Sequence, residues 1–118
     1  MDTKTFEEQL REWNVPFAMI ADLETGDAIR VGCSTGLEFD DLVNHLFRDT
    51  EAILATSRYL EGQILPRIWN QGQVSCVLCK PNDQTLVGLF LSDQRNPVEK
   101  YRWFQQLNSG VVNAFARA

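Results

Sequence analysis

One long periodic stretch, residues 35–62, constrains the fold of this chain more than any other feature. Apolar side chains recur there at spacings of three and four residues, as one face of an α-helix requires. Thr35 and Glu38 fit a capping box at the start, Gly62 suits the position just past the end, and no Pro or Gly intervenes between 37 and 61. The stretch therefore predicts a single helix, about 39 Å long at roughly 1.5 Å per residue.

This predicted helix has more apolar surface than one sheet face needs. A first group is expected to pack on a sheet and consists of Phe39, Leu42, Val43, Leu46, Ile53 and Leu60. A second group, Phe47, Glu51, Leu54 and Arg58, lies to one side of that stripe. We predict that the second group faces a second copy of the chain, because monomers seldom expose large apolar patches. The alternative is that both groups belong to one wide apolar face that packs in the core.

Shorter elements surround the long stretch. Helical periodicity or caps mark residues 3–13 and a last helix beginning at Asn96 and Pro97, and apolar runs between turn residues predict strands at 17–22, 28–33, 63–70, 74–80 and 85–92. The strand at 85–92 is apolar on both faces and should be central, with Gly88 admitting a close neighbour. Pro66 favours an edge position for the strand at 63–70, where Trp69 is a candidate partner contact.

These elements predict a mixed α/β fold with one domain spanning residues 1–118. The order is helix, two strands, long helix, three strands, helix. Short turns join the strands within each group, so the five-stranded sheet should be antiparallel. Helices on both of its faces would give three layers, α/β/α.

Composition excludes several classes of partner. The formal net charge of −5 argues against binding to nucleic acid or to an anionic membrane surface, since both need clustered basic side chains. No apolar run is long enough to span a bilayer. The first ten residues lack the basic and apolar segments of a secretory signal, so a cytoplasmic location is expected.

Catalytic signals are weak throughout, and we predict neither an enzyme nor a cofactor or metal site. None of the common nucleophile, phosphate-loop, zinc or dinucleotide motifs occurs. The lone His45 is interpreted as a solvated residue beside Asp41 and Asp49. Cys76 and Cys79 form a CxxC, but in a regular strand they would point to opposite faces, so a thiol redox pair is only an alternative.

The chain resembles a known family at this level. The segment AMIADLETGDAIRVGC is similar to the first hairpin of the roadblock/LC7 domain, a relative of the profilin and longin folds, and VSCVLCKPNDQTLVGLFLSD is similar to its later hairpin. The segment PRIW departs from a regular strand. The resemblance implies a non-enzymatic module that dimerises through the long helix and a neighbouring strand edge, and that regulates or scaffolds a small Ras-like GTPase or another protein.

The expected assembly is a homodimer, or a heterodimer with a related subunit. Its predicted contacts are Phe47, Glu51, Leu54, Arg58 and Trp69. Two other functions remain open: an acidic chaperone of the secretion type, which would need an apolar groove, and a small-molecule sensor, which would need a buried pocket.

Overall fold

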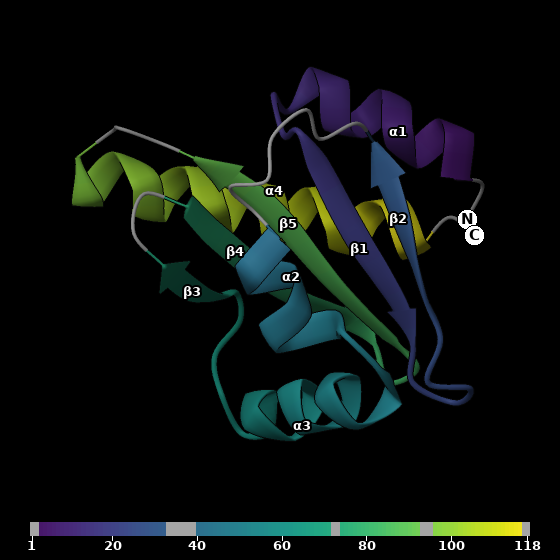
Figure 1. The fold of residues 1–118 in the computed structure, drawn as a ribbon. Helices are drawn as coiled ribbons and strands as arrows, with labels where there is room; N and C mark the ends of the chain where they lie inside the picture. Colours follow the sequence, from purple (N-terminus) through teal and green to yellow (C-terminus); the bar gives the residue numbers. More distant parts are fainter. Residues whose placement is uncertain (1–2, 33–39, 72–73, 93–95, 117–118) are drawn as a thin grey trace.

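The computed structural model describes residues 3–32, 40–71, 74–92 and 96–116. Its elements follow one another along the chain as α1 (Thr3–Glu12), β1 (Phe17–Asp22), β2 (Ala28–Gly32), α2 (Asp40–Phe47), α3 (Thr50–Leu60), β3 (Arg67–Gln71), β4 (Val74–Asn82), β5 (Thr85–Ser92) and α4 (Pro97–Ala116) (Figure 1). Four of the strands fall close to where the sequence predicts them, whereas β3 begins at Arg67, four residues later than the predicted strand at 63–70. β4 runs two residues further than expected, with an irregular register between Cys79 and Asn82.

The five strands form one antiparallel sheet in the order β2-β1-β5-β4-β3. β5 is central, as its doubly apolar pattern predicts, and β2 and β3 are the two edges. Pro66 directly precedes β3, so its missing N–H leaves the ladder with β4 intact.

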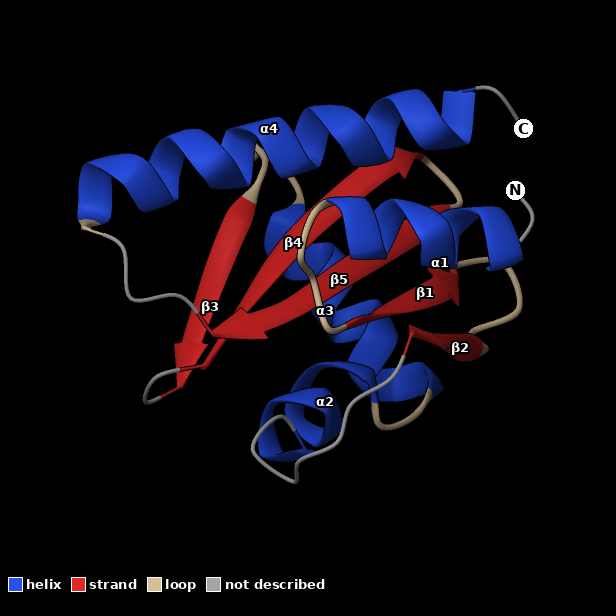
Figure 2. Ribbon diagram, turned by 90° about the horizontal axis from the view of Figure 1, so that it is seen from above, coloured by secondary structure: helices blue, strands red, loops and turns tan. Residues whose placement is uncertain are grey.

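Helices cover both faces of the sheet, which confirms the predicted three layers (Figure 2). The core under α2 and α3 consists of Phe17, Met19, Ala21, Leu42, Val43, Leu46, Phe47, Ile53, Leu60, Val74, Cys76, Leu78, Leu86 and Phe90. The core under α1 and α4 consists of Phe6, Leu10, Val15, Ala18, Val31, Val77, Cys79, Val87, Leu89, Leu91, Phe104, Leu107 and Val111. Successive side chains of a strand enter opposite cores, so the central strands must be apolar throughout.

The prediction of one long helix is wrong, because the helix is divided at Arg48 and Asp49. Asp49 has an extended backbone (φ −152°, ψ 179°), and its carboxylate accepts a hydrogen bond from the Ala52 N–H at 2.9 Å. An aspartate that caps a new helix competes with continuation of the old one, even without Pro or Gly. The expected capping box of Thr35 and Glu38, together with Phe39, lies outside the described residues.

Hydrogen bonds from two threonines fix the position of α3. The Thr56 hydroxyl, which is buried, contacts the carbonyl oxygens of Leu46 (3.0 Å) and Ala52 (2.9 Å), joining α3 to α2. The Thr50 hydroxyl donates to the Gly26 carbonyl at 3.1 Å. Gly26 has a φ of +78°, and a Cβ there would collide with Thr50. The turn between β1 and β2 therefore supports the start of α3.

The last helix begins as the sequence predicts. The Asn96 side chain accepts a hydrogen bond from the Glu99 N–H at 2.9 Å, and Pro97 occupies the first helical position. α4 then continues for 20 residues across the sheet. At Gly110 the helix passes so close to the Trp13 ring that a Cβ would lie 2.6 Å from a ring carbon. In the described part of the chain, no helix has both the length and the apolarity needed to cross a bilayer.

Candidate protein-interaction face

The outer side of α3 presents three of the four predicted helix contacts to solvent. Glu51, Leu54 and Arg58 are exposed, with Leu54 retaining 37% of its surface. The inner side of α3 buries Ile53, Thr56, Ser57 and Leu60 against the sheet and α2. This division agrees with the sequence prediction. We call the outward residues of α3, together with Trp69 of β3, the α3–β3 face.

Phe47 does not belong to this face, and the prediction that it points outward is wrong. Its side chain is 4% exposed and its ring lies 5.9 Å from that of Phe90. Because α2 ends at Phe47, the chain turns there and the ring enters the core instead of continuing the outer stripe of α3. It packs directly on Gly88, where a Cβ would lie 2.7 Å from the ring. Phe47 is thus the close neighbour that Gly88 was predicted to admit.

Trp69 lies on the edge strand, beside two aromatic rings from the helices. The ring centroids of His45 and Tyr59 are 5.0 Å and 5.5 Å from that of Trp69. Arg67 donates a hydrogen bond to the Tyr59 hydroxyl oxygen at 3.3 Å. Trp69 is partly buried against the core. His45 is exposed as expected, but its neighbour is Trp69.

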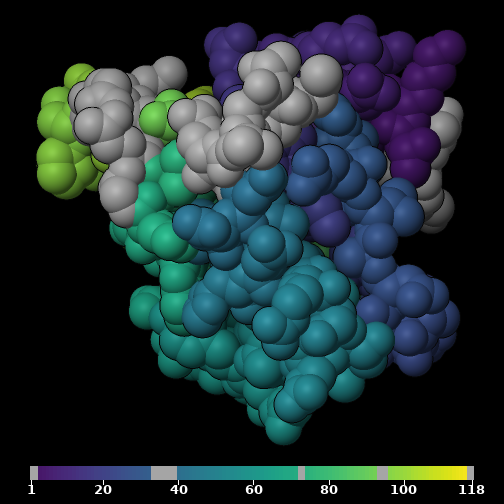
Figure 3. Space-filling model, in the orientation of Figure 1, coloured from purple at the N-terminus to yellow at the C-terminus, as the bar shows by residue number. Residues whose placement is uncertain are grey.

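A small apolar hollow opens between these rings. Its volume is about 190 Å³, and its lining comes from His45, Leu46, Ala52, Ala55, Thr56, Tyr59 and Trp69. Figure 3 shows the side of the molecule that α2 and α3 cover. Of the aromatic residues that line this hollow, the sequence indicates Trp69 as a candidate contact but not Tyr59. Tyr59 lies outside the apolar stripe of the predicted helix, so helical periodicity does not identify it.

The connection from α3 to β3 adds a further apolar group. Ile64 is 86% exposed, more than any other large apolar side chain in the described part of the chain. It precedes an edge strand whose outer side pairs with no other strand of the sheet. The sequence prediction did not include Ile64 among the candidate contacts. An isoleucine two residues before Pro66, in a segment expected at the sheet edge, could have indicated an exposed apolar side chain. Apolar side chains and an open strand edge therefore occur together on this side of the molecule.

A solved structure with a similar fold is that of Myxococcus xanthus MglB. The two share a TM-score of 0.55 at 9% sequence identity, over 92% of this chain and 89% of the MglB chain. The fold is roadblock/LC7-like. The resemblance predicted from the two hairpins is thus confirmed for the fold. No protein family and no curated protein sequence matches the chain.

The two cysteines of the CxxC are separated by the roadblock-like sheet. Cys76 enters the core under α2 and α3, and Cys79 enters the core under α1 and α4. Both are free and fully buried. Burial raises the pKa of the Cys79 thiol to about 12 and also raises the pKa of Cys76, with a smaller contribution from the neighbouring Cys79. Protonated thiols on opposite faces of a sheet do not form a redox pair.

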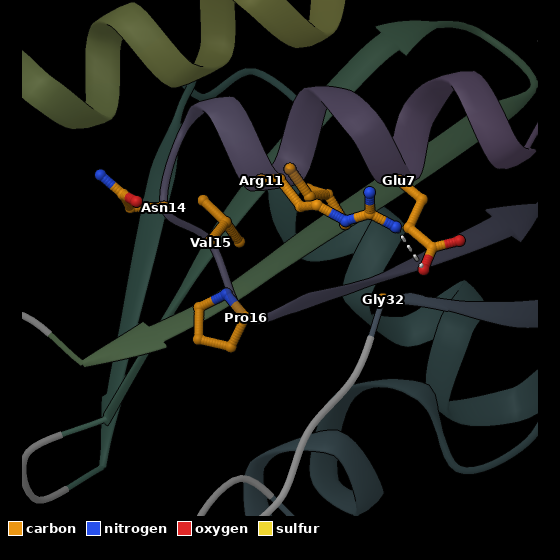
Figure 4. Close-up of a pocket in the computed structure, with 7 residues that line it drawn as sticks. Glu7, Arg11, Asn14, Val15, Pro16 and Gly32 are labelled. Atoms are coloured by element: carbon orange, nitrogen blue, oxygen red, sulfur yellow. Dashed lines mark hydrogen bonds and ion pairs between the residues drawn. The ribbon is translucent and has the colours of Figure 1, made fainter.

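A second hollow, of about 480 Å³, lies beside the C-terminal end of α1 (Figure 4). Glu7 and Arg11 border it and form an ion pair with a nitrogen–oxygen distance of 3.5 Å. Leu10, Val15, Pro16, Asn14 and Gly32 complete its lining. Its two charges neutralise each other, so it presents no net charge to a ligand. Among the described residues, no group of three His, Cys, Asp or Glu side chains could hold a metal ion.

Proposed function

We propose that the protein is a non-enzymatic, dimeric regulatory or scaffold module of the cytoplasm. The observation that carries the proposal is the α3–β3 face, where exposed Leu54 and Tyr59 adjoin half-buried Trp69 and an open strand edge. A second copy, or a related subunit, can cover the apolar side chains and extend the sheet at the same time.

The proposed partner of this dimer is a small Ras-like GTPase. The support is the fold shared with MglB, which is a roadblock/LC7-like GTPase regulator. A regulatory module needs no catalytic group of its own. The separation of Cys76 from Cys79 by the sheet argues against the thiol redox alternative.

The dimer is tested by measuring mass in solution. Size-exclusion chromatography with light scattering at micromolar concentration should give twice the chain mass of 13.5 kDa. Leu54→Asp should shift the protein to the monomer, because it places a charge in an apolar contact. The matched control is Val112→Asp on α4, since Val112 is 39% exposed and Leu54 is 37% exposed. A wild-type monomer, or equal effects of the two variants, would overturn the dimer.

The partner is tested separately, with purified GTPases. The small Ras-like GTPases of the source organism would be loaded with GDP or with a non-hydrolysable GTP analogue, and their binding to the immobilised dimer would be measured. We expect one of them to bind with a preference for one nucleotide state. If none binds in either state while the dimer is intact, the GTPase assignment is wrong and the scaffold assignment remains to be tested with other proteins.

A further inference from the structure

The second open edge of the sheet is β2, on the opposite side of the sheet from β3 (Figure 1). The Asp22 N–H donates a hydrogen bond to the Asp27 carbonyl oxygen at 2.8 Å, which makes these two residues a hydrogen-bonded pair of the β1–β2 ladder. Such pairs alternate along antiparallel strands, so Ile29 directs its N–H and C=O to β1, whereas Ala28 and Arg30 direct theirs outward. The edge therefore offers the backbone groups of two residues to another strand.

The side chains on the two faces of this edge differ in chemistry. Arg30 lies on the face that α2 and α3 cover, where its guanidinium carbon is 4.8 Å from the centroid of the Phe17 ring. It is exposed and forms no ion pair with another described residue. On the other face Ile29 is 47% exposed and borders a hollow of about 400 Å³, whose apolar lining includes Ile20 and Phe115. The edge is thus cationic on one face and apolar on the other.

We propose that the β2 edge binds an extended segment of another protein as a sixth strand, with an acidic side chain opposite Arg30 and an apolar side chain opposite Ile29. Hydrogen bonds to the outward backbone groups of Ala28 and Arg30 supply affinity, as in other cases of strand addition. Because side chains alternate across a strand, the residue next to the acidic one lies on the face of Ile29 and its hollow. The proposed dimer and GTPase contact do not use this edge, so the inference goes beyond the proposed function.

Charge selects the occupant of this edge. Edge strands often carry a basic side chain, which discourages pairing with unrelated strands. A second copy of β2 brings its own Arg30, so two β2 strands paired about this residue would set two guanidinium groups against each other. An acidic side chain removes that repulsion and gives Arg30 the counter-ion that no other described residue supplies. Arg30 therefore excludes basic or identical strands and admits an acidic one.

Two synthetic peptides test the proposal. Both have threonine at each end and valine on each side of the central residue, which is glutamate in one peptide and lysine in the other. Titration into isotopically labelled protein, followed by NMR, should shift the amide resonances of Ala28 and Arg30 and slow their hydrogen exchange. The glutamate peptide should bind about fivefold more tightly than the lysine peptide, since opposite charges attract and like charges repel across neighbouring strands.

Two variants at Arg30 distinguish strand addition from a merely adhesive surface. Arg30→Glu should reverse the preference, so that the lysine peptide binds more tightly than the glutamate peptide. Arg30→Pro should abolish the peptide-induced shift at Ala28 while the protein stays folded, because an edge strand tolerates proline where the N–H faces outward. The matched control is Arg102→Glu, which reverses an exposed charge on α4 and should leave the preference unchanged. Circular dichroism verifies the fold of each variant.

Three results would overturn the proposal. They are equal affinity of the two peptides for the wild-type protein, resonance shifts confined to β3, and no binding of either peptide at millimolar concentration. If Arg30→Pro does not fold, the reversal expected of Arg30→Glu still decides the matter. None of these results bears on the dimer, whose mass is measured independently.

Discussion

The two helical layers cover the two faces of the sheet in different ways. α4 crosses its face of the sheet as one helix of 20 residues, whereas α2 and α3 cover the opposite face as helices of 8 and 11 residues. The sequence predicts one helix for residues 35–62 and another that begins at Asn96 and Pro97. The difference shows that periodicity locates a buried stripe, while local hydrogen bonds decide where the backbone within it is interrupted.

The interruption has a consequence for the surface. Dividing the stripe at Asp49 lets α2 turn Phe47 into the core while α3 presents a separate outer ridge. In the α1–α4 layer, close packing of Trp13 on Gly110 holds the long helix against α1. The α2–α3 layer therefore places core residues next to the exposed side chains of the α3–β3 face.

The largest expected effect comes from the core side of each layer. Phe47→Ala should lower the free energy of unfolding by about 3–5 kcal/mol, the usual cost of a large aromatic cavity. Phe104→Ala, in α4, is the matched change, because both side chains are 4% exposed. Urea denaturation measures the two effects. A negligible loss for Phe47→Ala would contradict its place in the core and return it to the outer surface.

The contact between Phe47 and the central strand gives a second, smaller effect. Gly88→Ala should cost about 1–3 kcal/mol, because its Cβ would lie 2.7 Å from the Phe47 ring and 3.0 Å from the Cys76 sulfur. Phe47→Leu, which removes the ring, should destabilise less in the Gly88→Ala background than in the wild type. Additive effects in this double-mutant cycle would argue against direct contact.

The helix break can be tested through Asp49. The hydrogen bond from the Ala52 N–H is the main cause that lowers the pKa of the Asp49 carboxyl from 3.8. A carboxyl group whose pKa is lowered by folding stabilises the fold at pH values above its ordinary pKa. That stabilisation is lost as the pH falls through the lowered pKa. Asp49→Ala should therefore reduce the melting temperature by a few degrees at pH 7, with the difference disappearing in acid. The control is Glu8→Ala, which removes an exposed carboxylate within α1. It should change neither the melting temperature at pH 7 nor its dependence on pH.

The smallest expected effect is a difference in alkylation rate between the cysteine thiols of the two layers. Cys76 lies under α2 and α3 and Cys79 under α1 and α4, so alkylation of each reports opening of one layer. Cys76 should be modified faster, because α2 and α3 are both much shorter than α4 and should open more easily. Asp49→Ala should accelerate the modification of Cys76 more than that of Cys79. Peptide mass spectrometry after timed labelling measures both rates. Equal rates in every variant would show that the layers open together.

Much of the fold was predictable because its signals are local. The doubly apolar run at Thr85–Ser92 identifies the central strand, Pro66 identifies an edge, and Asn96 with Pro97 identifies the start of α4. Each depends on residues adjacent in sequence. The cap at Asp49 is also local, but it lies inside an uninterrupted apolar stripe, and that stripe gives the same pattern for one helix as for two.

The candidate interaction face was predictable only in part. Glu51, Leu54 and Arg58 could be assigned to the outside because they share one side of a regular helix. Phe47 could not, because its direction changes when the helix ends. The cluster of His45, Tyr59 and Trp69 joins three elements whose contact depends on how α2, α3 and β3 pack.

The amino-acid sequence by itself determined the layers, the antiparallel strands and the placement of Cys76 and Cys79 on opposite faces of the sheet, since alternation and helical spacing assign each side chain to a face. Tertiary structure alone decided that Phe47, which the sequence groups with Leu54 on the outer side, is buried. The physical reason is that burial depends on the direction of each helix relative to the sheet. Asp49 sets that direction for α3, leaving Leu54 exposed and Phe47 against Gly88.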